Sequence, residues 1–144
     1  MMAALDINPG NKGHIILFPK MHITNSFNMD NELFLNLTNA ANRLAEHVAK
    51  IVNATGVNIL IANGESAGQK LEHFLIHIIP RFENDKVRFI WDPQKISDEE
   101  MNQIVDGFKG FIIEPFKKEE PKIEEITEGV QQNYYYVNED DRIP

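Results

Sequence analysis

The segment 69–81, which reads QKLEHFLIHIIPR, constrains the fold of this chain more than any other part of its sequence. Apolar side chains occupy every second position of its central part, which predicts a β-strand over 72–79 that ends before Pro80. One face of such a strand carries Phe74, Ile76 and Ile78, and the other carries His73, Leu75 and His77. The apolar face should be buried. The histidine face is either an ordinary surface or a functional site.

Helix and strand patterns surround this strand on both sides. Apolar residues repeat at helical intervals from Asp30 to Val52, which predicts a long helix with Asp30 as its N-cap, stopped near Gly56, and with one face packed on a sheet. Further strands are predicted over 3–7, 14–18, 57–61 and 87–91. A capping box at Ser97 and Glu100 begins a second helix with one apolar side. We expect Trp91 to pack in the core.

The composition excludes several classes of function. The chain has no cysteine, which rules out disulfides, thiolate metal sites and cysteine nucleophiles. A formal net charge of -8 argues against a nucleic-acid partner. No apolar run is long enough for a membrane helix, and no basic flank with a cleavable apolar stretch opens the chain. We therefore expect a cytoplasmic protein that has no membrane partner.

Charge divides the chain into two parts. Residues 117–144 hold eight acidic and four basic side chains, and so carry half of the formal net charge. This distribution predicts one domain over 1–116 and an acidic C-terminal tail over 117–144. The tyrosines at 134–136 are a candidate contact for the body of the domain or for a protein partner.

The five histidines do not predict a metal site. On a strand, His73 and His77 stand about 13 Å apart, at about 3.3 Å per residue, so they cannot share an ion. His14 and His22 flank the predicted strand over 14–18, where packing or a surface position is expected rather than catalysis. We therefore expect neither a metal nor a cofactor.

Several motifs resemble the histidine triad (HIT) family of nucleotide-binding proteins. Ala67-Gly68-Gln69, followed by alternating histidines and Ile-Pro-Arg, is similar to that family's signature, in which three histidines alternate on one strand. Upstream motifs match in order and spacing: Leu5 to Pro9, Gly13-His14, Phe18-Pro19-Lys20 and His22. Downstream, residues 81–93 and the Ser97 helix resemble the family's C-terminal part, so the resemblance covers about residues 2–110.

This resemblance implies a HIT-like α+β fold, with a long helix on one face of an antiparallel sheet, a C-terminal helix and a homodimer. It implies a purine nucleotide as partner, whose α-phosphate lies over the histidine strand and is attacked by the middle histidine. His73 and His77 match the outer catalytic histidines, and Leu75 stands at the nucleophile position. The matching nucleotide-binding positions are Asp6, for the ribose hydroxyls, and Asn63, Gly64, Ser66, Gly68, Gln69 and Lys70 in the phosphate-side loop.

The chain departs from the family pattern on this same face. Leu75 cannot attack phosphorus, Ala62 stands where an amide side chain is common, and Lys70 stands where Ser or Thr is common. We expect nucleotide binding to persist and nucleotidyl-transfer or hydrolase chemistry to be lost or strongly impaired. The family also carries a helix and a hairpin before the segment equivalent to 2–6, so we expect an N-terminally truncated domain.

Two alternative functions stay open. The first is an active hydrolase of nucleoside phosphoramidates or dinucleoside polyphosphates, in which water attacks directly and His73 or His77 acts as the base. The second is a non-catalytic dimeric scaffold, which would bind no nucleotide. Nucleotide-induced stabilisation separates the scaffold from the other two, because a ligand that binds only the folded state must stabilise it.

Overall fold

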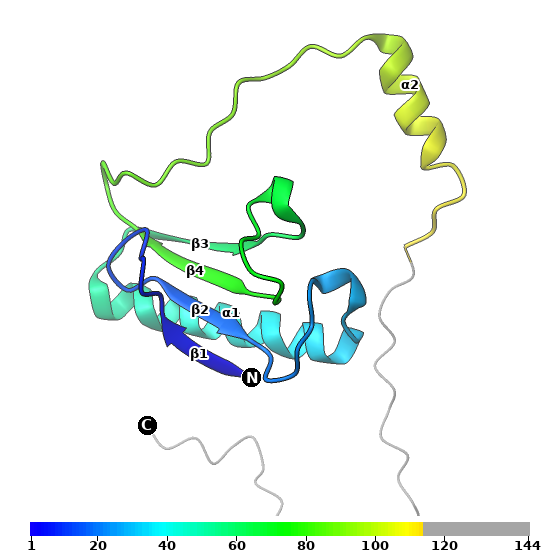
Figure 1. The fold of residues 1–144 in the computed structure, drawn as a ribbon. Helices are drawn as coiled ribbons and strands as arrows, with labels where there is room; N and C mark the ends of the chain where they lie inside the picture. Colours follow the sequence, from blue (N-terminus) through cyan, green and yellow to red (C-terminus); the bar gives the residue numbers. More distant parts are fainter. Residues whose placement is uncertain (114–144) are drawn as a thin grey trace, which may run out of the picture. The chain divides into compact units, whose positions relative to one another are not determined.

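The computed structural model describes residues 1–113, and the chain forms two compact units, Met1–Pro93 and a second unit that begins at Gln94. The first unit is a four-stranded antiparallel sheet with a long helix across one face (Figure 1). Its strands are β1 (Met2–Leu5), β2 (Ile15–Phe18), β3 (Gly56–Ile61) and β4 (Ile76–Arg81), in the spatial order β1-β2-β4-β3. Its helices are η1 (Ser26–Asn28), α1 (Asn31–Val52) and η2 (Glu65–Ala67). The α+β class with an antiparallel sheet is confirmed.

The long helix α1 begins where the sequence predicts. The Asp30 carboxylate accepts the backbone N–H groups of Glu32 and Leu33 at 2.9 and 3.2 Å, which satisfies two of the unpaired donors of the first turn. The helix ends at Asn53, whose φ of 55° lies in the left-handed region that asparagine tolerates. Gly56, which was expected to stop the helix, instead begins β3.

The core lies between α1 and the sheet. Four α1 residues at helical spacing are buried: Leu37, Ala41, Ala45 and Val48. They form one cluster with Leu17 of β2 and with Phe74, Ile76 and Ile78, each of which is 0% exposed. The alternation that predicted a buried apolar face on this segment is therefore confirmed.

The strand β4 begins later and ends later than predicted. It starts at Ile76 rather than at residue 72, so His73 and Leu75 precede it, and it continues through Pro80 to Arg81. The lead-in keeps the strand-like alternation, because His73 and Leu75 are half-buried and Phe74 between them is buried. A backbone hydrogen bond of 2.6 Å from Phe74 N–H to the carbonyl of Ile23 fixes this lead-in against the segment after β2.

The strand predicted over 87–91 does not form. The Asp85 carboxylate accepts the Val87 N–H at 3.0 Å, and the Arg81 guanidinium donates to the Val87 carbonyl, so both backbone groups of Val87 are used in a turn. Beyond it, Ile90 and Trp91 are 85% and 80% exposed. The expectation that Trp91 packs in the core is wrong for this chain.

Asp85 joins this turn to the β1–β2 connection. Its carboxylate accepts hydrogen bonds from Arg81, from the Phe82 and Val87 N–H groups, and from the Asn11 side chain at 2.8 Å. These donors stabilise the ionised form, so the pKa of Asp85 lies well below its usual range. The Asp85 carboxylate therefore links the turn after β4 to the β1–β2 connection, although the two are distant in the sequence.

The second unit, described by itself, contains α2 (Asp98–Gly107). The predicted capping box is confirmed: Ser97 Oγ accepts the Glu100 N–H, and the Glu100 carboxylate accepts the Ser97 N–H. The predicted boundary at 116, the acidic tail and its tyrosines lie outside the described residues. Among residues 1–113, no helix has the length and apolar character that crossing a membrane requires.

Replacing Asp85 with Asn should destabilise the protein at pH 7, and the loss of stability should be smaller in acid. A carboxyl whose pKa is depressed in the folded state adds stability above its unfolded-state pKa of about 3.9, and this contribution is lost as the pH falls through the folded-state pKa. The measurement is the urea midpoint of both proteins at pH 7 and pH 3. The difference between the urea midpoints of the two proteins should be smaller at pH 3 than at pH 7. Exposed Asp92→Asn is the control, and an equal gap for Asp85→Asn at both pH values would contradict this assignment.

Candidate functional site

Three polar side chains gather on the face of the sheet opposite α1. Leu17 of β2 pairs with Ile76, and both are buried beneath α1, whereas the next pair along, Ile16 and His77, points to the other face. Asp6 follows β1 by one residue and His14 precedes β2 by one, which brings both beside His77. The topology therefore assembles a carboxylate and two imidazoles from β4 and from the positions next to β1 and β2.

The two imidazoles are joined by a hydrogen bond. His14 Nε2 and His77 Nδ1 are 3.1 Å apart. The Asp6 carboxylate lies 3.7 Å from His14 Nδ1 and 4.0 Å from His77 Nδ1. His14 is 6% exposed, whereas the His77 side chain keeps 26% of its surface. The sequence analysis expected His14 to pack or to lie at the surface; it is buried, but its contact with His77 was not predicted.

The hydrogen bonds assign the protons on this pair. The Gly10 N–H donates to His14 Nδ1 at 3.1 Å, so the neutral His14 ring carries its proton on Nε2. That proton is donated to His77 Nδ1, and neutral His77 therefore carries its own proton on Nε2. Burial lowers the pKa of both His14 and His77, and this effect is larger than the opposing effect of the Asp6 charge. The lowered pKa values favour these neutral forms.

The same three side chains are the one group among the described residues with the composition and closeness of a metal site. One ligand atom from each of Asp6, His14 and His77 lies within 4.8 Å of the others. Metal binding would use ring nitrogens that are engaged in the hydrogen bonds from Gly10 and between the two rings. The arrangement is therefore better suited to orienting protons than to holding an ion.

His73 has a different environment from His77. Its ring lies edge-on to Phe18 and His22, with centroid distances of 5.8 and 5.4 Å. Its Nδ1 is 3.1 Å from the carbonyl oxygen of Phe74, which can only accept a hydrogen bond. Neutral His73 therefore carries its proton on Nδ1 and presents an unprotonated Nε2. Leu75, between the two histidines in the sequence, is half-buried and offers no polar group.

The loop after β3 is held by two of the residues predicted to bind nucleotide. Asn63 accepts the Ser26 N–H at 3.0 Å and donates to Ser26 Oγ at 2.8 Å. Gln69 accepts the Gly64 N–H at 2.8 Å and donates to the carbonyls of Thr24 and Leu71. Both amide side chains therefore connect the loop to neighbouring backbone, which gives them a positioning role that the sequence did not indicate.

The two loop glycines serve the backbone conformation. Gly64 and Gly68 have φ values of 91° and 93°, in the left-handed region that favours glycine. The N–H groups of Ala67, Gly68 and Gln69 all donate to carbonyls within the loop. These three backbone N–H groups therefore have partners inside the loop.

A hollow of about 650 Å³ lies against this loop. It is lined by Thr24, Asn25, Gly64, Glu65, Gly68, Gln69, Lys70, Leu71 and Glu72. Four of the predicted positions therefore share one hollow, while half-buried Asn63 bonds to Ser26 instead and Ser66 is exposed on η2. Asp6 and His77 belong to the separate cluster on the sheet.

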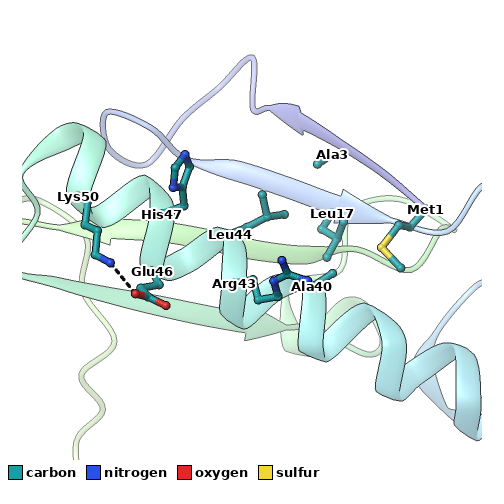
Figure 2. Close-up of a pocket in the computed structure, with 9 residues that line it drawn as sticks. All are labelled: Met1, Ala3, Leu17, Ala40, Arg43, Leu44, Glu46, His47 and Lys50. Atoms are coloured by element: carbon teal, nitrogen blue, oxygen red, sulfur yellow. Dashed lines mark hydrogen bonds and ion pairs between the residues drawn. The ribbon is translucent and has the colours of Figure 1, made fainter. Parts of the chain in front are cut away.

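A second hollow lies on the helix side of the sheet, between α1 and the β1–β2 edge (Figure 2). Leu17 and Leu44 contribute apolar surface, while Arg43, His47 and an ion pair of 2.6 Å between Glu46 and Lys50 add charge. Because Leu17 points away from the face that carries His77, this hollow is not part of the histidine site.

Comparisons with known proteins agree with this arrangement. Residues 1–84 match the family model described as HIT domain. An uncharacterized HIT-like protein from Methanocaldococcus jannaschii is 34% identical over 112 residues, which are 76% of this chain and 83% of that protein. An adenosine 5′-monophosphoramidase from Schizosaccharomyces pombe is 30% identical over 104 residues, 72% of this chain and 75% of that protein.

A solved structure of a HIT family member from Bacillus subtilis superimposes with a TM-score of 0.68. It is 30% identical, and the match covers 78% of this chain and 82% of that one. The sheet, the long helix and the order of the motifs therefore agree with a known fold as well as with related sequences.

The stability of the protein should fall as the pH is lowered from about 7 to about 5. His14 and His77 have lowered folded-state pKa values, so below about 6.5 the unfolded chain binds more protons than the folded one, and acid favours unfolding. Melting temperatures at pH 7, 6 and 5 measure this slope. His14→Gln should make it shallower, and exposed His47→Gln should leave it unchanged. A slope in His14→Gln equal to that of the parent would refute the role of His14.

Proposed function

Because this chain belongs to the HIT domain family, we propose that it binds a purine nucleotide over the surface that carries His73, Leu75 and His77. The related protein from Schizosaccharomyces pombe is an adenosine 5′-monophosphoramidase, which supports an adenosine nucleotide as the first ligand to test. In this proposal the nucleotidyl-transfer and hydrolase chemistry through a covalent intermediate is lost or strongly impaired.

The proposed ligand position follows from the charges and donors around the histidines. The ribose hydroxyls would donate to the Asp6 carboxylate, one oxygen of which already accepts the Asn8 N–H at 2.8 Å. The α-phosphate would lie beside Leu75, where the His77 Nε2–H donates to an oxygen. Exposed Lys70, at the hollow beside the loop, supplies a cation for further phosphates.

The observation that carries the proposal is Leu75 itself. The half-buried side chains of His73, Leu75 and His77 alternate with buried apolar residues, so all three belong to the face opposite α1. The outer two offer complementary nitrogens, one unprotonated and one protonated. The middle position, which would form the covalent bond to phosphorus, holds an aliphatic side chain.

A homodimer forms part of the same proposal. Within residues 1–113, the sheet order places β3 (Gly56–Ile61) at one edge, where it pairs only with β4. An edge strand is available to pair with a second chain. Sedimentation equilibrium of the full chain tests this point independently of nucleotide binding.

The parent protein should bind adenosine 5′-phosphoramidate with a rise in melting temperature but should cleave it slowly or not at all. Leu75→His restores an imidazole at the nucleophile position, so an adenylylated protein should form and the substrate should turn over. Intact mass after a quench that avoids acid detects the adduct, and ammonia release measures turnover. Leu75→Asn is the matched control, since it is polar but cannot form the adduct.

The possible results separate the three functions. Rapid hydrolysis by the parent would mean that the chemistry is not impaired. If neither the parent nor Leu75→His is stabilised by the nucleotide, the binding proposal fails and a scaffold without a ligand is favoured. Binding by both proteins, with an adduct only in Leu75→His, supports the proposal.

A further inference from the structure

We propose that the hollow between α1 and β1 is an interface between two copies of this chain, and that its occupant is the apolar side of α2 from the second copy. That side is formed by Met101, Ile104, Val105 and Phe108. The exchange is reciprocal, so each chain gives one helix and receives one. This inference does not depend on the nucleotide site, and it concerns a different surface from the edge of β3.

The sheet face that α1 covers is open at β1. α1 packs chiefly on β4 and β3, and all four residues of β1 are exposed. Ala3 pairs with Leu17, so its side chain points to the face on which Leu17 is buried, and Leu5 shares that face. Because Ala3 is small, a hollow of about 640 Å³ remains beside Leu44 (Figure 2). Such a sheet face is normally buried against a further helix or sheet.

α2, described by itself, has the size and the surface that this hollow requires. Its four apolar residues recur at helical spacing, and each is 46–65% exposed. Ten helical residues are about 15 Å long and four strand residues about 13 Å long, so α2 matches the length of β1. Among residues 1–113, α2 is the only helix besides α1 that is longer than three residues.

The charges at the hollow and on α2 are complementary. Glu46 in the hollow is paired with Lys50 at 2.6 Å, whereas Arg43 has no carboxylate partner within residues 1–113. The first turn of α2 carries Asp98 and Glu99. Opposite charges at the rim of an apolar contact favour the correct partner and orientation. The helix and the hollow therefore match in charge as well as in apolar surface.

The segment that leads to α2 favours a second copy as the source of the helix. No helix or strand forms between Val87 and Ser97, and the first unit leaves its own Ile90 and Trp91 exposed. A group of large apolar side chains that a domain leaves uncovered marks a site of contact with another chain. Exchange of an identical element between protomers is a low-cost route to such a contact.

Introduced cysteine pairs test this contact directly, because the chain has no cysteine of its own. The full-length variants Ala3→Cys/Val105→Cys and Ala40→Cys/Val105→Cys place one thiol in the hollow and one on the apolar side of α2. Air oxidation should give a disulfide-linked dimer in at least one of them, since a disulfide needs Cα atoms about 4.4–6.8 Å apart. Asn42→Cys/Gln103→Cys, at exposed positions outside the contact, is the control and should stay reduced.

The oxidised products separate the possible occupants. A disulfide-linked dimer in either hollow variant, absent from the control, supports the proposal. A disulfide within one chain, detected as an oxidised monomer by intact mass, would show that the hollow holds the chain's own α2 and would overturn the assignment to a second copy. If neither hollow variant forms a disulfide, or if the control forms as much, the interface itself is refuted.

A charge placed in the contact gives an independent measurement. Val105→Lys would carry an ammonium group into an apolar hollow that already holds Arg43. The dissociation constant of the dimer, from sedimentation equilibrium, should rise at least about tenfold, since burying an unpaired charge costs more than the ~1.4 kcal/mol that a tenfold change represents. Gln103→Lys adds the same charge on the opposite side of α2 and should leave the constant unchanged.

These measurements do not depend on the nucleotide. If Val105→Lys dimerises as tightly as the parent, the copies are held elsewhere, as at the edge of β3, and the inference fails. A parent that stays monomeric also refutes it. Calorimetry with an adenosine nucleotide reports separately on the proposed function, because Val105 and Gln103 lie outside the residues proposed to bind it.

Discussion

The burial of one apolar row beneath α1 determines how the rest of this domain is arranged. Phe74, Ile76 and Ile78 are fully buried, and removing each such side chain from water contributes about 1.5–3 kcal/mol. A shift of one residue would place histidines against the helix and expose this row to water. The direction in which His73 and His77 point is therefore fixed by packing on the other face of the same segment.

A second constraint acts on the face of the sheet opposite α1. The His14 ring is buried there, and burying its nitrogens without hydrogen-bond partners would cost free energy. The Gly10 amide and His77 satisfy its two nitrogens in the neutral form. Because Asp6 is too far from either ring for a hydrogen bond, it adds charge rather than a competing acceptor. The pair thus shows how packing and backbone geometry can decide which nitrogen of a buried histidine holds the proton.

Local signals predicted much of the fold and only part of the site. Asp30 and Ser97 mark helix starts because capping depends on a few adjacent residues, and the alternation around Phe74 identifies the buried face. The contact of His14 with His77 joins positions 63 residues apart, and no local pattern contains it. The strand expected over 87–91 fails for a similar reason, since Arg81 and Asp85 use the backbone of Val87.

The hydrogen bond from Asn11 to Asp85 has a consequence for the communication between distant parts of the domain. Asn11 is adjacent to Gly10, whose amide sets the proton position on His14, while Asp85 lies 74 residues away in the sequence. Any event that loosens the turn around Asp85 therefore weakens the support of the Gly10 amide as well. The exposed segment that follows this turn is therefore linked to the histidine pair through the hydrogen bonds of Asp85 and Asn11 and the amide of Gly10.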